Sequence, residues 1–199
     1  MSNKEQIITI LEETNRPGIT DLIQYMQYND FFTAPCSSMY HLCREGGLAE
    51  HSLSVYQFGF WLLESPSFAI AEQYKLSQLH PDSNPSWSIV SLLHDIGKST
   101  YRNKPNYTPN ILKSGKISDS KPYETNKDRL FISHEIVSLQ IISKFIELTE
   151  EEEFAILYHN GMYTASGRDI QGKERPLQQL LHFCDMWCSR FIETKEVAE

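Results

Sequence analysis

The sequence predicts an all-α fold, and two observations carry that prediction. Apolar residues recur three and four positions apart in most segments, which is the spacing of one buried helix face. No segment has a convincing strand pattern, apart from a short hairpin that Ser114 and Gly115 could turn. With 199 residues the chain can bury a core, so we expect one domain over 1–199, with a helical arm at 1–29 and the main core at 30–193.

The composition limits the classes of partner. The chain has 18 basic and 26 acidic residues, for a net charge of −8. This charge argues against binding long duplex nucleic acid and favours a small nucleotide or a short oligonucleotide end. It leaves a local basic pocket and assembly into a homo-oligomer open. The four cysteines form no CxxC pair, so we expect buried free thiols in a reducing cytosol.

Neither a signal peptide nor a membrane span is visible. The first residues are polar, and no run of about 18 apolar residues occurs. We therefore expect a cytoplasmic protein without membrane contact.

The first two helices are predicted by their apolar faces. One covers about 4–15 and ends near Pro17, and the second covers about 20–28. The turn-rich segment 30–38 then closes this N-terminal arm.

The next helix begins at the pair Gly46–Gly47 and runs to about Leu63. His51 stands in the middle of its apolar stripe, where a lone histidine is usually a hydrogen-bonded core residue. Arg44, just before the glycines, could approach an anionic ligand, although it fits a solvated surface charge equally well. A further helix is expected at about 67–79.

An apolar segment from Trp87 to Leu93 ends in a histidine and an aspartate. Trp87, Val90 and His94 are three and four apart, so His94 and Asp95 should point inward. Burying an aspartate is unfavourable unless it is paired or binds a metal. Imidazole nitrogen and carboxylate oxygen suit Mn, Fe, Co, Ni or Zn better than Mg or Ca. A satisfied buried His–Asp pair is the alternative for this dipeptide alone.

Residues 99–130 form the least regular segment, and so long a loop in a compact domain is usually functional or disordered. Lys98 precedes it, about one turn after the histidine, where its ammonium could reach a phosphate held by a metal. We expect the segment to lie over a metal pocket, with a mobile excursion as the alternative. Four residues offer cations for a phosphate and rings for a base: Tyr101, Arg102, Lys104 and Tyr107.

Three helices close the domain. The first covers about 133–147. The second starts with a capping box, Thr149 with Glu152, and stops at Gly161. The last runs from Pro176 to about Glu193. Each carries a titratable residue at or near its inward face, namely His134, His159 and Asp185.

Together, six such residues lie on five predicted helices: His51, His94, Asp95, His134, His159 and Asp185. Each alone has an ordinary explanation, but together they would leave the core with many unsatisfied polar groups. A dinuclear metal centre removes that difficulty, because cations replace water as their partners.

This order of ligands, with Gly97–Lys98 after the His–Asp pair, resembles the HD-domain superfamily of metal-dependent phosphohydrolases over about 30–193. The segments Gly46–Ser52 and Leu92–Lys98 are similar to the HD domain of bacterial 3′–5′ exoribonucleases. The whole pattern is similar to small stand-alone HD hydrolases of Firmicutes and their phages. The resemblance implies an HD-domain helical bundle with an insert at 99–130. It also implies that His51, His94, Asp95 and Asp185 hold one divalent transition ion, and that Asp95, His134 and His159 hold a second.

The function that this resemblance implies is hydrolysis of a nucleotide phosphate ester, as in a nucleotidase or a nucleoside-triphosphate hydrolase, by a water shared between the two ions. Asp95 and Lys98 would be the catalytic residues. Two alternatives stay open, namely a 3′–5′ exonuclease or phosphodiesterase on short single-stranded or cyclic nucleotides, and a non-catalytic nucleotide-binding module. Substrate contacts are expected from Arg44, Lys98, Tyr101, Arg102 and Lys104.

Overall fold

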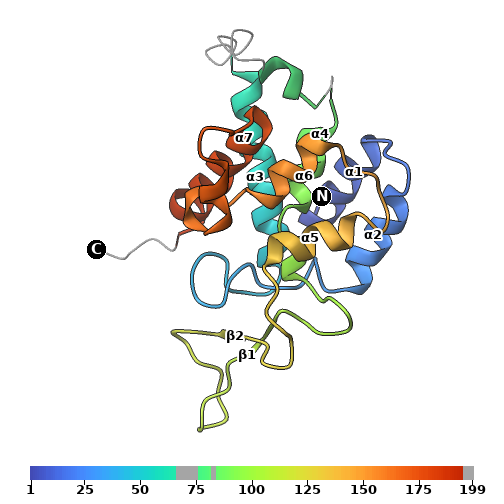
Figure 1. Cartoon of the computed structure of the whole chain (residues 1–199). Coiled ribbons are helices and arrows are strands. Elements are labelled where there is room, and N and C mark those ends of the chain that lie inside the picture. Colours follow the sequence, from blue (N-terminus) through green and yellow to red (C-terminus); the bar gives the residue numbers. More distant parts are fainter. Residues whose placement is uncertain (66–75, 82–83, 195–199) are drawn as a thin grey trace.

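The computed structural model describes residues 1–65, 76–81 and 84–194. Helices dominate them, with one two-stranded sheet, so the predicted all-α class is confirmed (Figure 1). The α-helices are α1 (Asn3–Glu13), α2 (Ile19–Tyr28), α3 (Gly47–Glu64), α4 (Ser86–Leu93), α5 (His134–Ile142), α6 (Glu150–Leu157) and α7 (Pro176–Trp187). Shorter helical turns are η2 (Leu76–Leu79), η3 (Ile96–Lys98), η4 (Gly161–Tyr163), η5 (Ser166–Ile170) and the π-helical η6 (Cys188–Ile192).

Local sequence explains the start of α6, while two other helices differ from their predicted bounds. Thr149 accepts the Glu152 N–H while the Glu152 side chain accepts the Thr149 N–H, so α6 starts with the predicted capping box. The helix predicted at 133–147 ends earlier, at Ile142. Residues 66–75 of the helix predicted at 67–79 lie outside the described residues, and the part that is described, Leu76–Leu79, is a 3₁₀ turn.

The centre of the bundle is the contact between α3 and α4. A Cβ on Gly59 would lie 2.0 Å from the Trp87 ring, so the glycine lets the indole pack directly against the α3 backbone. The indole N–H also donates to the Tyr56 carbonyl at 3.1 Å. α7 and α6 pack around this pair, which places the ends of α4 and α6 next to one another in the core.

The turn after α4 is fixed to the start of α5. A Cβ on Gly97 would lie 2.2 Å from the His134 carbonyl oxygen, and the Gly97 N–H donates to Ser138 Oγ at 2.9 Å. Ser138 in turn donates to the His94 carbonyl at 2.6 Å. The glycine is therefore required for the close approach of two backbones.

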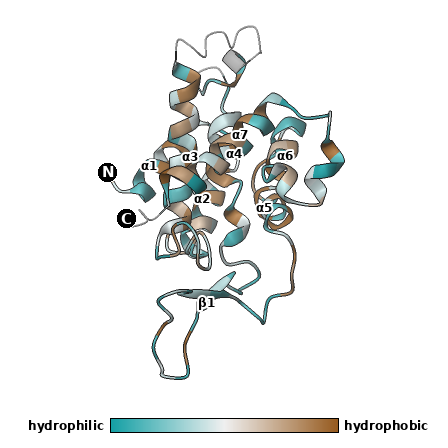
Figure 2. Cartoon of the chain, turned by 90° about the vertical axis from the view of Figure 1, so that its left-hand side faces the viewer, coloured by the Kyte–Doolittle hydropathy of each residue, from teal (hydrophilic) through white to brown (hydrophobic). Residues whose placement is uncertain are grey.

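The segment 99–130 contains the predicted hairpin. Strands β1 (Tyr107–Pro109) and β2 (Tyr123–Thr125) pair antiparallel, and Gly115 turns the tip with a φ of +80°. The hairpin protrudes from the helices, as Figures 1 and 2 show from two directions.

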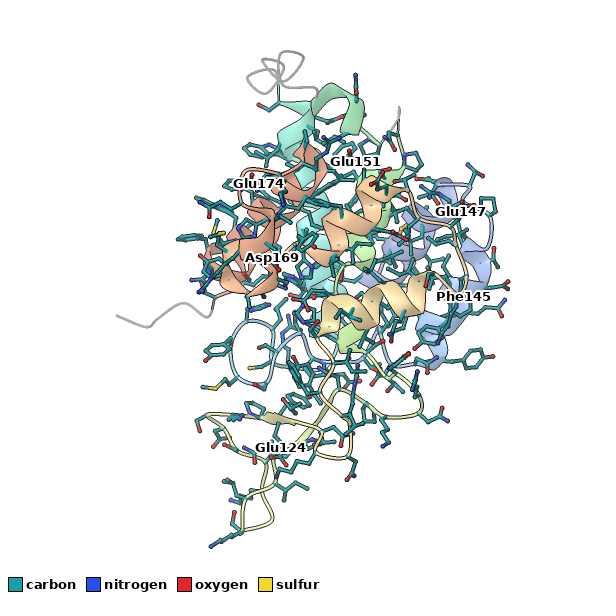
Figure 3. The ribbon with its side chains drawn as sticks, viewed as in Figure 1. Glu124, Phe145, Glu147, Glu151, Asp169 and Glu174 are labelled. Atoms are coloured by element: carbon teal, nitrogen blue, oxygen red, sulfur yellow. The ribbon has the colours of Figure 1, made fainter. Side chains whose placement is uncertain are left out.

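Apolar segments, brown in Figure 2, gather where the helices pack. Exposed carboxylates such as Glu147, Asp169 and Glu174 lie on the outside in Figure 3, consistent with the acidic composition. None of the helices in the described part of the chain is both long and apolar enough to cross a membrane.

Candidate metal centre

All six predicted ligands converge on one place in the bundle. His51 comes from α3 and Asp185 from α7, whereas the other four lie at helix ends. His94 and Asp95 follow α4, His134 begins α5, and His159 comes just after α6. The contacts of α4 with α3, α6 and α7, and of α5 with the turn after α4, bring these ends together.

Asp95 is the middle of the cluster, and its side chain is only 1% exposed. Its Oδ1 lies 3.1 Å from His134 Nε2 and 3.6 Å from His159 Nε2. Its Oδ2 lies 3.6 Å from His94 Nε2 and 3.7 Å from His51 Nε2. Each carboxylate oxygen therefore faces a different pair of histidines, which is the same division of ligands that the family resemblance implies.

Two of the histidines are oriented by their own backbone. His94 Nδ1 donates to the Ser91 carbonyl at 2.9 Å, and His159 Nδ1 donates to the Ile156 carbonyl at 2.7 Å. Each bond leaves the Nε2 lone pair turned toward Asp95. Burial lowers the pKa of His94 to about 3 and also lowers the pKa of His159, so both rings are neutral, as a metal ligand must be.

His51 differs, because its Nδ1 faces a carboxylate, Glu193, at 2.9 Å, while its Nε2 lies 3.1 Å from Asp185 Oδ1. Burial would lower the pKa of His51, but Cys36, Asp185 and Glu193 raise it well above its usual range. Burial would likewise raise the pKa of Asp185, yet the contact with His51 and the other histidines lowers it. The raised pKa of His51 means that its Nε2 carries a proton when no cation is bound. A cation at Nε2 would take the place of that proton and interact with the same carboxylates.

The residues present fit a divalent metal ion. Among the described residues, four buried side-chain polar atoms have no hydrogen-bond partner: His51 Nε2, His94 Nε2, Asp95 Oδ1 and Glu135 Oε2. The first three face this centre. Asp185 Oδ1 lies 3.1 Å from His51 Nε2 and His134 Nε2 lies 3.1 Å from Asp95 Oδ1, but neither pair has the angles of a hydrogen bond. Buried polar atoms without partners are strongly disfavoured, and a cation bound by nitrogen and oxygen would satisfy them together.

Lys98 is adjacent to the ligands but differs in orientation from the sequence expectation. We expected its ammonium to reach toward a phosphate held by a metal. Instead, Nζ lies 2.6 Å from Asp95 Oδ2, because the buried carboxylate attracts it. Burial would lower the pKa of Lys98, but Asp95 raises it well above its usual range, so the ammonium stays charged.

A cavity of about 360 Å³ lies beside the cluster. The helical bundle contributes Lys98, His134 and Asn160 to its walls, and the long segment contributes Tyr107 and Arg129. Arg129 donates to the Gly97 carbonyl at 2.9 Å and to the Ser99 carbonyl at 3.0 Å, which fixes the end of the insert to the turn that bears Lys98. The insert therefore forms one side of the cavity, as expected for a segment next to the metal pocket.

Three of the predicted substrate contacts in the insert lie elsewhere. Tyr101 is buried, and its hydroxyl donates to Gln140 Oε1 at 2.9 Å. Arg102 stacks over the Tyr101 ring, and Lys104 donates to the Asp128 carbonyl. The chain makes a tight turn here, because Arg102 has a φ of 52° and the next residue also has a positive φ. This turn pairs Tyr101 with Lys104, and none of the three residues lines the cavity.

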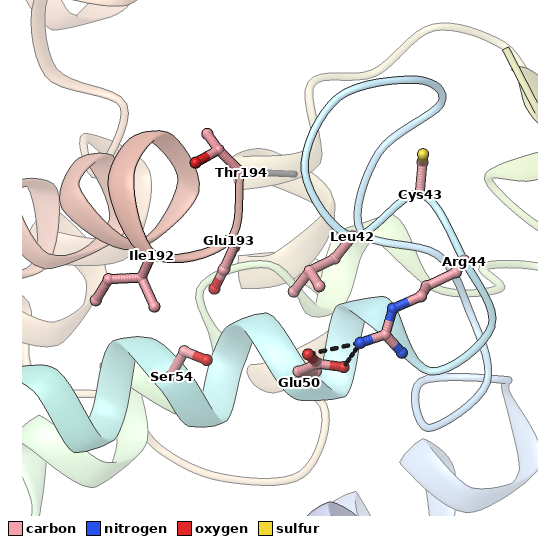
Figure 4. Close-up of a pocket in the computed structure, with 8 residues that line it drawn as sticks. All are labelled: Leu42, Cys43, Arg44, Glu50, Ser54, Ile192, Glu193 and Thr194. Carbon is pink, nitrogen blue, oxygen red and sulfur yellow. Dashed lines mark hydrogen bonds and ion pairs between the residues drawn. The ribbon is translucent and has the colours of Figure 1, made fainter. Parts of the chain in front are cut away.

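Arg44 is also not in this cavity. Its side chain is 60% exposed and donates to Glu50 at 2.7 Å, in a separate pocket next to the end of the described chain (Figure 4). The structure therefore places this arginine in an ion pair on the surface, which was the alternative to an anion contact.

Three residues that sequence reasoning missed now belong to the site. Arg129 could have been found, because a hairpin brings its two ends together and so returns the chain to Gly97. Asn160 donates to Glu135 Oε1 at 2.7 Å and lies 3.0 Å from His159 Nε2, but nothing in its sequence context indicated this. Glu193, the carboxylate behind His51, had no local signal either.

Comparisons with known proteins gave one finding. A family model described as HD domain matches residues 48–186, which include all six ligands, Lys98 and the insert. No curated protein and no solved structure matches the chain.

Proposed function

The chain belongs to the HD domain family of metal-dependent phosphohydrolases, and we propose that it hydrolyses a phosphate ester of a nucleotide. The observation that carries the proposal is the combination of the buried histidine–aspartate cluster with the cavity beside it. That cavity offers two cationic side chains, Lys98 and Arg129, and two aromatic ones, Tyr107 and Phe131. Cations suit a phosphate and rings suit a base, so both parts of a nucleotide have partners there.

We further propose that the centre holds two divalent transition ions, with Asp95 between them. Support comes from its two oxygens, which face separate histidine pairs. The mixture of imidazole and carboxylate donors favours Mn, Fe, Ni, Co or Zn. When bound, such ions lower the pKa of a coordinated water and polarise the phosphate.

The protein's own side chains have distinct tasks in this proposal. Lys98, which is charged and fixed beside Asp95, stabilises the negative charge that grows on the phosphate in the transition state. Arg129 holds the backbone on both sides of Lys98 through its two carbonyl bonds, so the ammonium is positioned before substrate arrives. Burial raises the pKa of Tyr107, so this phenol stays protonated and can donate a hydrogen bond to the substrate.

A second candidate activity is supported by one feature of the rim. Leu130 and Phe131 line the cavity, yet these residues are 85% and 92% exposed. An exposed ring beside a phosphate site is a typical stacking platform for single-stranded nucleic acid. This feature favours a phosphodiesterase or 3′–5′ exonuclease acting on a short single strand.

A substrate screen tests both candidates. The protein loaded with Mn²⁺ is assayed with nucleoside mono- and triphosphates, cyclic dinucleotides, short RNA and DNA, and the nitrophenyl mono- and diesters of phosphate. We expect a nucleotide monoester to have a higher kcat/KM than the nitrophenyl monoester, or an oligonucleotide or cyclic dinucleotide to have a higher kcat/KM than the nitrophenyl diester. Nitrophenyl esters that react equally well would contradict the nucleotide assignment. The variant Asp95→Asn, which keeps the shape of the side chain, controls for contaminating hydrolases.

A further inference from the structure

The side chain of Glu193 is buried at the end of the described chain, where it is 3% exposed. Its carboxylate faces one ring nitrogen, His51 Nδ1, at 2.9 Å from one oxygen and 3.1 Å from the other. Within the described ranges, His51 is the side chain's only hydrogen-bond or ion-pair partner. Because a buried carboxylate is unfavourable without a partner, this single contact accounts for its position.

The backbone that carries Glu193 is unusual. α7 continues as the π-helical turn η6, and the Glu193 N–H donates to the Cys188 carbonyl, five residues earlier, at 2.9 Å. Such turns are rare and are frequently found at functional sites. In this chain, the turn places a carboxylate directly behind a metal ligand.

We propose that Glu193 is a positioning residue of the metal centre. It accepts the Nδ1 proton of His51 and thereby holds Nε2, the nitrogen that would bind the cation, toward Asp95 and Asp185. The inference rests on the proposed metal site. Glu193 lies outside residues 48–186, the part of the chain that the family model matches, so the assignment comes from this structure alone.

The role of Glu193 follows from a comparison with the groups that orient the other histidine ligands. His94 and His159 donate from Nδ1 to backbone carbonyls of their own chain segment. His51 donates to a charged carboxylate instead, which makes its Nε2 a stronger donor to a cation. Losing such an outer partner typically weakens metal binding by roughly 10- to 100-fold.

The pocket in Figure 4 supplies a matched control. Glu193 and Glu50 both line it, and Glu50 precedes His51 in the sequence. The Glu50 carboxylate pairs with Arg44, however, and in the described part of the chain no hydrogen bond or ion pair joins it to His51. Glu50→Ala therefore removes the same charge from the same pocket without removing the bond to His51.

The experiment measures Mn²⁺ binding to the full chain by calorimetry for wild type, Glu193→Ala, Glu193→Gln and Glu50→Ala. We expect Glu193→Ala to raise the Kd by about 10- to 100-fold and Glu50→Ala to stay within about twofold of wild type. Glu193→Gln should lie between them, because its amide oxygen still accepts from Nδ1. Equal Kd values for Glu193→Ala and wild type, or equal losses in Glu193→Ala and Glu50→Ala, would overturn the proposal. Should the alanine variant not fold, the glutamine variant carries the same comparison.

A second readout needs no metal. In protein with ¹⁵N-labelled histidine and without added ions, NMR should find a slowly exchanging, downfield Nδ1 proton on His51. Glu193→Ala should lose this signal, whereas Glu50→Ala should keep it. An unchanged signal in Glu193→Ala would overturn the positioning role. If wild type bound no Mn²⁺ while the signal behaved as expected, the proposed function would fail and the bond from His51 to Glu193 would stand.

Discussion

The two sides of the cavity are held in place by different kinds of bond. On the ligand side, the rings of His94 and His159 donate to carbonyls only three residues earlier in the chain. On the insert side, Arg129 bonds to the Ser99 carbonyl, 30 residues away. Helical geometry thus fixes the ligands locally, whereas the insert wall depends on long-range polar bonds at its base. This difference indicates that metal binding and substrate binding can be changed separately.

Asp95→Ala should have the largest effect, because it removes the residue that faces both histidine pairs. Metal affinity should fall by more than the roughly 100-fold loss typical of an outer partner, and hydrolysis should fall to background. Elemental analysis after dialysis and steady-state kinetics measure the two. His134→Ala, which alters one pair, should leave one ion bound. An Asp95→Ala protein that kept its metal and activity would refute the ligand side as described.

Lys98→Ala should have the next largest effect and should separate catalysis from metal binding. Removing one electrostatic donor lowers kcat by about 100-fold, while the six ligands stay in place and metal content stays unchanged. Lys98→Arg should recover part of the loss, because a planar guanidinium does not reproduce a compact ammonium. Kinetics and elemental analysis on the same preparations provide the check. Values of kcat and kcat/KM within twofold of wild type in Lys98→Ala would remove this lysine from the mechanism.

Arg129→Ala tests the bonds at the base of the insert, which also hold the backbone on both sides of Lys98. Losing the two carbonyl bonds should loosen the wall and raise KM by about tenfold. A tenfold change corresponds to about 1.4 kcal/mol, which is close to the free energy of a single hydrogen bond from a charged donor. Metal content should not change. Arg102→Ala is the matched control from the same insert, since this exposed side chain lies over the Tyr101 ring and does not line the cavity. A higher KM in Arg102→Ala than in Arg129→Ala would mean that Arg102 contacts the substrate, as its position in the sequence predicted.

The smallest effect is expected at the tip of the hairpin. Residues 111–117 are exposed. They pair with one another through the Ile111–Ile117 bridge and through the Leu112 N–H, which donates to the Lys116 carbonyl at 2.8 Å. Replacing 112–116 with Asn-Gly should leave kcat and KM within about twofold, because shortening a surface loop changes its closure entropy little. Replacing 106–122 with a Gly/Ser linker should instead raise KM, because it removes Tyr107 from the wall. Equal kinetics in the two variants would show that strand β1, with Tyr107, contributes nothing to substrate binding.

The same contrast explains what could be predicted from the sequence. Helical spacing placed His51 and His94 on inward faces, and the structure brings them together with the other ligands. Irregular chain has no such period. Tyr101 and Arg102 were expected in the cavity because they follow Lys98, but positive φ angles reverse the chain there. Glu193 escaped prediction for a related reason, because a π-helical turn shifts the face on which a residue lies.

Gly97 has a consequence for the spacing of the whole centre. The backbones of the turn after α4 and of the start of α5 touch at this residue, without any side chain between them. One of these backbones carries Asp95 and the other carries His134. The separation between the two halves of the centre is therefore set by the thickness of the peptide chain itself, a dimension that no substitution can make smaller. Every other amino acid at position 97 would widen it.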